Sequence, residues 1–119
     1  MDLNDAMDRM LRLAEEGNWD EWALCFAAGA TIRQNFSPGE RTVDDVVAGF
    51  RKMGLSVRYE NIRRIVRDGL VVEYHDARLG LAGKGAVVDV ALIVEFNVDG
   101  KATSVSEYLD SAALASLMA

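Results

Sequence analysis

Two segments of alternating hydrophobicity near the end of the chain, 86–98 and 101–110, flank the dipeptide Asp99-Gly100. Asp-Gly between alternating runs is the strongest short-range signal for a β-hairpin, because both central residues of a type I′ turn need positive φ. The sequence therefore predicts two antiparallel strands that meet at this dipeptide. In a strand, successive side chains point to opposite faces, so the residues on each face can be counted in twos.

The second of these strands carries a carboxylate on its apolar face. Counting in twos places Glu107 between Val105 and Leu109. Burial of a charge costs free energy unless the charge is paired or hydrogen-bonded, so we expect Glu107 to have polar partners or a raised pKa. A carboxyl group of this kind suits acid/base chemistry, and the alternative is a structural carboxylate paired with Arg33 or a backbone donor.

The first part of the chain predicts two helices. Apolar residues recur at helical spacing over 3–14, and Gly17 is placed to end that helix. A second helix begins at Asn18, which forms a capping box with Glu21, and we expect it to end near 28–29.

The remaining elements follow from the same signals. A short strand is expected at 31–35, followed by a turn-forming segment at 36–40 and a helix at 43–53 that a capping box from Thr42 starts. A strand from 56 onward changes its phase near Asn61, which indicates a bulge. The last expected elements are a turn at Asp68-Gly69, a strand at 70–79, a loop at 80–85, the hairpin strands and a short helix at 111–118.

Helices that precede a run of hairpin-linked strands are typical of an α+β fold, in which one sheet face packs against the helices. With 119 residues, the chain is long enough for one core and too short for two, so we expect a single domain over 1–119. A long sheet with a bulge curls around what it covers. The concave side is therefore the expected place for a pocket.

Charge and cysteine content exclude several classes of partner. The formal net charge is −6, and no apolar run approaches the length of a membrane span, which argues against nucleic acid and membrane. We expect Arg63, Arg64 and Arg67 to form a solvated strand face. One cysteine, Cys25, and one histidine lie far apart, so no metal-ligand spacing occurs. The opening residues lack the pattern of a signal peptide, and the cytoplasm is the expected location.

Several local patterns accompany this element order: Trp19–Trp22, Thr31–Asn35, the two Asp-Gly hairpins and the ending Ser106–Asp110. On these features the chain resembles the nuclear transport factor 2-like superfamily, and more narrowly its SnoaL-like branch, which shares its fold with ketosteroid isomerase and limonene-1,2-epoxide hydrolase. The resemblance implies a cone-shaped curved sheet wrapped around N-terminal helices, with a conical pocket. Members range from isomerases, hydrolases and cyclases to proteins without activity, so the fold does not select a reaction.

The epoxide hydrolase offers the best local match. Its motif of tyrosine, glutamine and asparagine before a proline-containing loop is similar to Arg33-Gln34-Asn35 before Pro38. This likeness implies that Asn35 helps to hold an attacking water. The last-strand aspartate of the hydrolase falls on Glu107.

The strand at 70–79 leaves an alternative open. Its two faces carry Glu73 with His75 and Tyr74 with Asp76, and neither face is cleanly apolar. Neither pair restores the arginine and aspartate that the epoxide hydrolase has at this point. Some SnoaL-like cyclases use an acidic residue and a nearby histidine for proton transfer, an arrangement that Glu107 and His75 resemble. Family members often have a histidine at this point, before an arginine like Arg78, so the resemblance implies that His75, the only histidine, faces inward. The alternative for His75 is a plain hydrogen-bonded residue.

These arguments define a candidate site. The predicted catalytic residues are Glu107, His75 and Asn35. The predicted substrate-binding residues are Arg33, Glu73, Trp22, Phe26, Phe50, Met53 and Tyr59. For the aromatic residues the alternative is a place in the core, and for Arg33 and Asn35 it is stabilisation of a turn or a surface ion pair.

The sequence thus predicts a small enzyme without cofactor or metal that binds an apolar small molecule and performs acid/base chemistry of the epoxide hydrolase, isomerase or cyclase type. The alternative is a non-catalytic module that binds a small ligand or dimerises. An enzyme should have Glu107 and a second polar group at a cavity of about 300 Å³ or more. The strand at 86–96 is apolar on both faces, which together with the resemblance predicts a homodimer through the outer sheet face.

Overall fold

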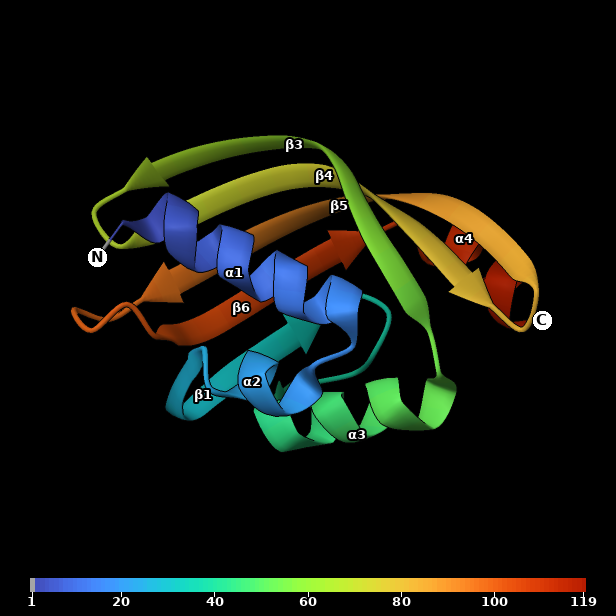
Figure 1. Cartoon of the computed structure of the whole chain (residues 1–119), viewed down its shortest axis with the longest axis horizontal. Coiled ribbons are helices and arrows are strands. Elements are labelled where there is room, and N and C mark those ends of the chain that lie inside the picture. The colour runs from blue at the N-terminus through green and yellow to red at the C-terminus, as the bar shows by residue number, and fades with distance from the viewer. Residues whose placement is uncertain (1) are drawn as a thin grey trace.

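The computed structural model describes residues 2–119. Its helices are α1 (Leu3–Glu16), α2 (Trp19–Ala23), α3 (Val43–Met53) and α4 (Ser111–Met118). Its strands are β1 (Phe26–Gln34), β2 (Glu40–Thr42), β3 (Ser56–Arg67), β4 (Leu70–Leu81), β5 (Lys84–Phe96) and β6 (Ala102–Leu109). Three helices therefore precede most of the sheet and one follows it, as the α+β prediction required (Figure 1).

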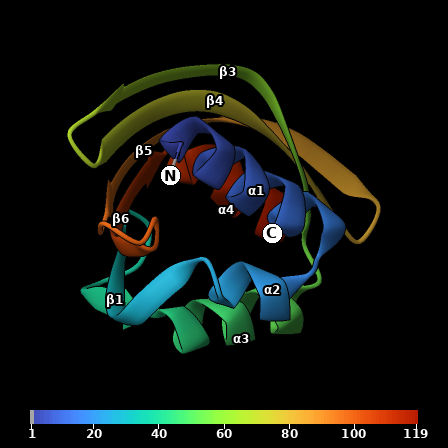
Figure 2. The ribbon, with the colours of Figure 1, turned by 60° about the vertical axis from the view of Figure 1, so that its left-hand side comes forward.

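All six strands form one curved, open sheet in the order β2-β1-β6-β5-β4-β3. Neighbouring strands are antiparallel except for β1 and β6, which are parallel. Figure 2 shows β3, β4 and β5 arching over α1, while α2 and α3 lie opposite this arch. The concave face of the sheet is thus the one that the helices cover.

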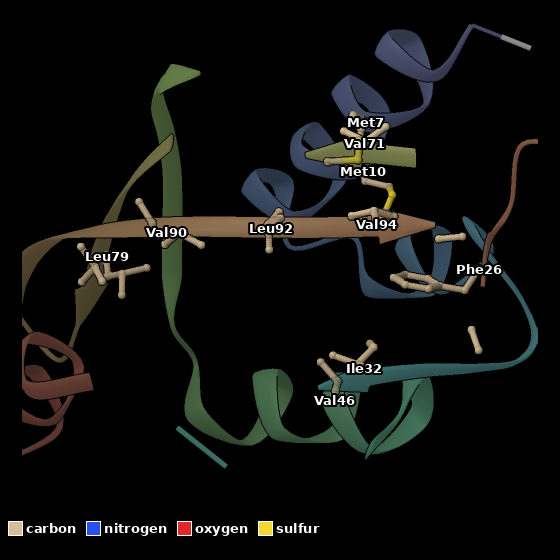
Figure 3. Packing of buried hydrophobic residues seen from close by; sticks show 14 of the residues in the cluster. Met7, Met10, Phe26, Ile32, Val46, Val71, Leu79, Val90, Leu92 and Val94 are labelled. Carbon is tan, nitrogen blue, oxygen red and sulfur yellow. The ribbon is translucent and has the colours of Figure 1, made fainter. Parts of the chain in front are cut away.

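The hydrophobic core lies between the concave sheet face and the helices. Met7 and Met10 of α1 meet Val94 of β5, while Ile32 of β1 and Val46 of α3 close the other side (Figure 3). All five are at most 7% exposed. Apolar surface removed from water stabilises a fold by roughly 25 cal/mol per Å². Core packing therefore holds the sheet in its curved form.

The local signals for the starts of α2 and α3 and for the bulge in β3 are confirmed. Asn18 caps α2 and Thr42 caps α3 through side-chain oxygens that accept backbone N–H groups. The register between β3 and β4 shifts between Glu60 and Arg63, so the bulge predicted near Asn61 is present, and Asn61 has φ of 56°. Bulges bend a strand, and this one contributes to the arch over α1.

The predicted end of the second helix is wrong. Helix α2 stops at Ala23, and β1 begins at Phe26, in a region expected to be helical. Phe26 pairs with Ala102 of β6, a contact across most of the chain that no local pattern reveals. Gly29, with φ of 76°, lies where the β1–β6 register shifts, which is a position that favours glycine.

The loop predicted at 80–85 is also wrong. Strands β4 and β5 continue to a two-residue turn formed by Ala82 and Gly83, whose φ angles are 51° and 82°. Two positive φ values are the mark of a type I′ turn, and the right-handed twist of the strands favours that turn. Strand β2, a short edge strand paired with β1, was not predicted either.

The turn at Ala82 generates a stability prediction. Alanine in the left-handed region costs about 1–2 kcal/mol, whereas asparagine tolerates it. We expect Ala82→Asn to raise the free energy of unfolding by about 0.5–1 kcal/mol, measured by urea titration. Ala115→Asn, at an exposed position inside α4, is the matched control and should lower it. A loss of stability in Ala82→Asn would contradict the turn assignment.

Candidate functional site

A cavity of about 110 Å³ lies on the concave side of the sheet. Its polar lining comes from Gln34, Arg41, Tyr59, His75 and Glu107, and the remaining lining residues are aromatic or aliphatic side chains and a glycine. A second hollow of about 70 Å³ shares Gln34, Tyr59 and Glu107 with the first. Both are smaller than the roughly 300 Å³ that we expected of an enzyme.

Glu107 reaches this cavity from β6 and is held by a chain of hydrogen bonds. Gln34 donates from Nε2 to Glu107 Oε1 at 2.9 Å, and Arg41 donates from Nη1 to Gln34 Oε1 at 3.3 Å. The arginine can only donate, so it fixes the orientation of the Gln34 amide and directs its NH₂ group at the carboxylate. Burial raises the pKa of Glu107, while the hydrogen bond from Gln34 and the charge of His75 act in the opposite direction.

His75 reaches the cavity from β4 and belongs to a second polar chain. Its Nδ1 atom lies 2.5 Å from Glu73 Oε2, and the other oxygen of Glu73 accepts from Arg64 Nε at 2.7 Å. Arg64 continues through Nη1 to Asp8 of α1 at 3.0 Å. Glu73 and His75 are 0% and 1% exposed, which makes them the most deeply buried polar side chains of the described residues. The expected inward orientation of His75 is confirmed.

Strand β5 lies between β4, which carries Glu73 and His75, and β6, which carries Glu107. Leu92 of β5 pairs with Glu73 on one side and with Glu107 on the other, and His75 lies two residues further along β4 than Glu73. Neighbouring strands are about 4.8 Å apart, so the backbones of Glu73 and Glu107 are roughly 10 Å apart. The side chains of Glu107 and His75 therefore approach the same cavity from two strands that do not touch.

Tyr59 of β3 completes the polar lining. Its ring meets the His75 ring edge to face, with 4.8 Å between ring centroids. Burial raises the pKa of the Tyr59 phenol strongly, and the negative charge of Glu107 adds to this shift. The hydroxyl group therefore keeps its proton at neutral pH and can donate it in a hydrogen bond.

The other predicted polar residues lie elsewhere. Arg33 is exposed on β1 and pairs with Glu40 at 3.7 Å. Asn35 binds the backbone of Leu109, donating to its carbonyl at 2.9 Å and accepting from its N–H at 3.1 Å. Neither residue lines the two hollows around Glu107. Both positions correspond to the structural alternatives considered for them.

The apolar predictions divide between the two hollows. Phe50, Met53 and Tyr59 line the larger one, whereas Trp22 and Phe26 line the smaller one. Glu73 lines neither, because it lies behind His75 with both oxygens engaged.

Four residues of the polar chains were missed, and one of them, Asp8 of α1, enters only as the partner of Arg64. Gln34 shares a face with the apolar Ile32 by counting in twos, so its inward position was available from the sequence. Arg64 was expected to be solvated, which is wrong, because its side chain is only 9% exposed. Arg41 carried no signal, since its role depends on how β2 folds against β1.

A comparison with protein-family models identifies the family of this chain. A family model described as the SnoaL-like domain matches residues 7–105, which is most of the chain. The chain belongs to the SnoaL-like family. The matched residues end shortly before Glu107.

Solved structures agree on the SnoaL-like fold at low sequence identity. A candidate polyketide cyclase from Xanthomonas campestris has 13% identity and a TM-score of 0.84, with 98% of this chain and 96% of that chain covered. An NTF2-like protein of unknown function from Cytophaga hutchinsonii has 15% identity and a TM-score of 0.75, covering 96% and 95%. An LEH-like epoxide hydrolase from M. tuberculosis has 15% identity and a TM-score of 0.79, covering 96% and 87%. At these identities the likeness shows the fold alone.

A search of curated proteins finds no match to this SnoaL-like chain. Within residues 2–119, no helix is long and apolar enough to span a membrane. The same residues contain no cluster of three or more side chains that could hold a metal ion.

The raised pKa of Glu107 makes stability depend on pH. Its stabilising contribution is complete below about pH 4.3, the value in an unfolded chain, and is lost as pH rises through the higher folded-state pKa. Glu107→Gln lacks this titration and its amide oxygen can still accept from Gln34. We expect it to gain stability over the wild type between pH 4 and pH 8, by about 1.4 kcal/mol for each unit of pKa elevation.

Urea unfolding at both pH values measures this difference. Glu95→Gln, on the exposed face of β5, is the matched control. An equal change in both variants would show that burial of Glu107 is not its cause.

Proposed function

We propose that this SnoaL-like protein binds a small apolar molecule with one oxygen function and transfers a proton on it. The observation that supports the proposal is the arrangement of Glu107 and His75, two titratable groups that reach one apolar cavity from separate strands. Acid/base catalysis needs one group to take a proton and another to supply one, both within reach of the substrate. The Tyr59 hydroxyl adds a hydrogen-bond donor at the same cavity.

The proton balance is simple for a carbonyl substrate. One group removes a proton from the carbon beside the carbonyl, and the electron pair of that C–H bond moves to form an enol or enolate. The carbonyl oxygen takes a hydrogen bond or a proton from the other group or from Tyr59. When the substrate has a carbon–carbon double bond next to that carbon, the electron pair extends to a dienolate, and return of the proton to the far carbon of the former double bond restores the carbonyl and gives the conjugated isomer. No net oxidation occurs, and the steps need no cofactor.

An epoxide substrate uses the same groups. One group takes a proton from a water molecule, whose oxygen attacks an epoxide carbon as the C–O bond breaks. The other group protonates the leaving oxygen, and the product is a diol. The likeness to an LEH-like epoxide hydrolase gives the fold for such chemistry but not the residues, because the Asp-Arg-Asp pattern expected of that enzyme is absent from β4 and β6.

The cavity volume favours small substrates. An apolar cavity of about 150 Å³ holds one benzene molecule. The two hollows that share Glu107, of about 110 Å³ and 70 Å³, add up to about 180 Å³, so a ligand of about seven non-hydrogen atoms is near the upper limit. Polycyclic substrates do not fit this volume.

The same volume favours a second candidate function, which is ligand binding without catalysis. Glu107 already accepts from Gln34, and Glu73 occupies His75 Nδ1. A carboxylate and an imidazole with these partners could orient a ligand without transferring a proton. The two functions differ in whether a bound molecule is chemically changed.

A ligand panel tests binding and turnover together. The panel contains cyclohex-3-enone and cyclohexene oxide as small probes and a tricyclic quinone as a large one. A ligand that binds the folded state raises the melting temperature by mass action. We expect the small probes to raise it and the tricyclic quinone to leave it unchanged.

Glu107→Gln separates the two functions. If the protein is an enzyme, this variant should still bind a small probe but convert it at least 100-fold more slowly, because general acid/base catalysis contributes about 10²–10⁴-fold. Product formation is followed by chromatography. Unchanged turnover in the variant would refute the acid/base role of Glu107, and binding without turnover in the wild type would favour the binding module.

We also propose that the protein is a homodimer through the outer sheet face. Ile65, Val72 and Ile93 form one continuous row across β3, β4 and β5 on that face, and they are 71%, 41% and 40% exposed. Tyr74 and Tyr108 lie in the next row. Contiguous exposed apolar surface of this kind is typical of an interaction site.

Light scattering at micromolar concentration tests the dimer. We expect twice the chain mass for the wild type and the single chain mass for Ile93→Lys, since a lysine in the apolar row would have to be desolvated. Val98→Lys, in the exposed turn between β5 and β6, is the matched control and should remain a dimer. A monomeric wild type would refute the proposal.

A further inference from the structure

The chain of side chains behind His75 is more elaborate than a buried core requires. It runs from Asp8, which is 60% exposed on α1, through Arg64 and Glu73 to His75 at the cavity. We propose that Glu73, held by Arg64, is a positioning residue that keeps the proton of His75 on Nδ1 and presents Nε2 to the cavity as the base of the site. This inference rests on the function proposed above.

The two oxygens of Glu73 have separate partners. Oε1 accepts from Arg64 Nε at 2.7 Å, and Oε2 lies 2.5 Å from His75 Nδ1. An ionised carboxylate has no proton to donate, so the hydrogen of this second contact must be on Nδ1. A neutral imidazole carries one N–H, which leaves Nε2 with a lone pair. No hydrogen bond from another residue occupies Nε2 within residues 2–119.

Arg64 keeps Glu73 in the form that this arrangement needs. A buried carboxylate without a cation would be costly, and a protonated one could donate to Nδ1 and reverse the tautomer. The Arg64 guanidinium is itself fixed, because its Nη1 donates to the backbone and side-chain oxygens of Asn4 and to Asp8. Arg64 Nη2 is buried and has no hydrogen-bond partner among residues 2–119. Burial of an unsatisfied donor costs free energy, so the contact with Glu73 is kept in spite of this cost.

The arrangement assigns the two cavity groups to different tasks. Within residues 2–119, the Glu107 carboxylate receives a hydrogen bond only from neutral Gln34, and burial raises its pKa, which favours the protonated form. His75 faces Glu73 on β4, Tyr59 on β3 and Glu107 on β6, of which Glu73 alone binds its ring nitrogen. His75 Nε2 then takes the proton from the substrate carbon or from water, and Glu107 supplies one to the substrate oxygen. A carboxylate that orients a catalytic imidazole in this way acts through the histidine and touches no substrate.

The test uses the fact that His75 is the only histidine in the chain. Nitrogen NMR of protein labelled with ¹⁵N-histidine therefore reports a single ring. At a pH where a titration shows the neutral ring, we expect Nδ1 of the wild type to have the shift of a protonated nitrogen and Nε2 that of an unprotonated one. The opposite pattern in the wild type would overturn the inference.

Two variants remove the carboxylate. In Glu73→Gln the single amide oxygen is needed by Arg64, so the NH₂ group faces Nδ1 and the proton should move to Nε2. The double variant Glu73→Leu/Arg64→Met replaces both charges by apolar groups, so that no unpaired arginine is left to destabilise the fold. The proton of the neutral His75 ring should again be mainly on Nε2. Glu60→Gln, which loses only the surface partner of Arg78, is the matched control and should keep the wild-type pattern.

If a folded Glu73 variant keeps its proton on Nδ1, the positioning role is refuted. With a substrate from the panel, Glu73→Gln should lower kcat by about 10- to 100-fold and change KM little, the range seen when a group that orients a histidine is lost. A change in KM alone would also refute it. The tautomer is measured without any ligand, so its outcome is independent of whether the panel contains a substrate.

Discussion

Burial of charge on a concave, apolar sheet face is the constraint on which the arrangement of this protein depends. The two inward carboxylates, Glu73 and Glu107, would each be costly if left alone. Each is connected to a guanidinium, Glu73 directly to Arg64 and Glu107 through Gln34 to Arg41. The cations reach in from the outer strands β3 and β2, so the centre of the sheet keeps apolar walls around a few oriented polar groups. Ligand sites in proteins commonly have this composition.

The candidate site could be predicted where a strand alternates cleanly. Glu107 lies between two apolar neighbours on β6, and its inward position followed from that pattern alone. On β4 both faces mix charged and apolar residues, so the inward position of His75 needed the resemblance as well. On β1 the parity was available, since Ile32 points inward and Gln34 must follow it, but the motif drew attention to the residues on either side. A motif carries residue types, whereas strand parity decides which of them a ligand can reach.

The fold could be predicted where its determinants are local. Helix caps, the bulge at Asn61 and the turn at Asp68 depend on a few adjacent residues, and all appear at the expected places. The turn at Asp99-Gly100 is also present, but only Gly100 has positive φ and the strands stop at Phe96 and Ala102, so the connection is longer than the expected two-residue turn. The stretch after Ala23 was missed because its conformation depends on β6, almost eighty residues further along. Arg64 was missed for a related reason, since its partners lie on α1 and β4. Strand pairing between distant segments can override the local conformational preference of a segment, and the local sequence then gives no sign of it.

The parallel pairing of β1 with β6 joins the first long strand to the last. It also joins Gln34 to Glu107, which lie 73 residues apart. A nascent chain can build α1, α3 and the β3–β4 hairpin while synthesis continues, yet β1 has no inner neighbour until β6 has left the ribosome. Contacts of such separation are closed late and slowly in folding. Products that terminate before β6 would therefore keep an unpaired strand edge and lack Glu107, so exposure to aggregation and loss of the buried carboxylate of the cavity would have the same cause.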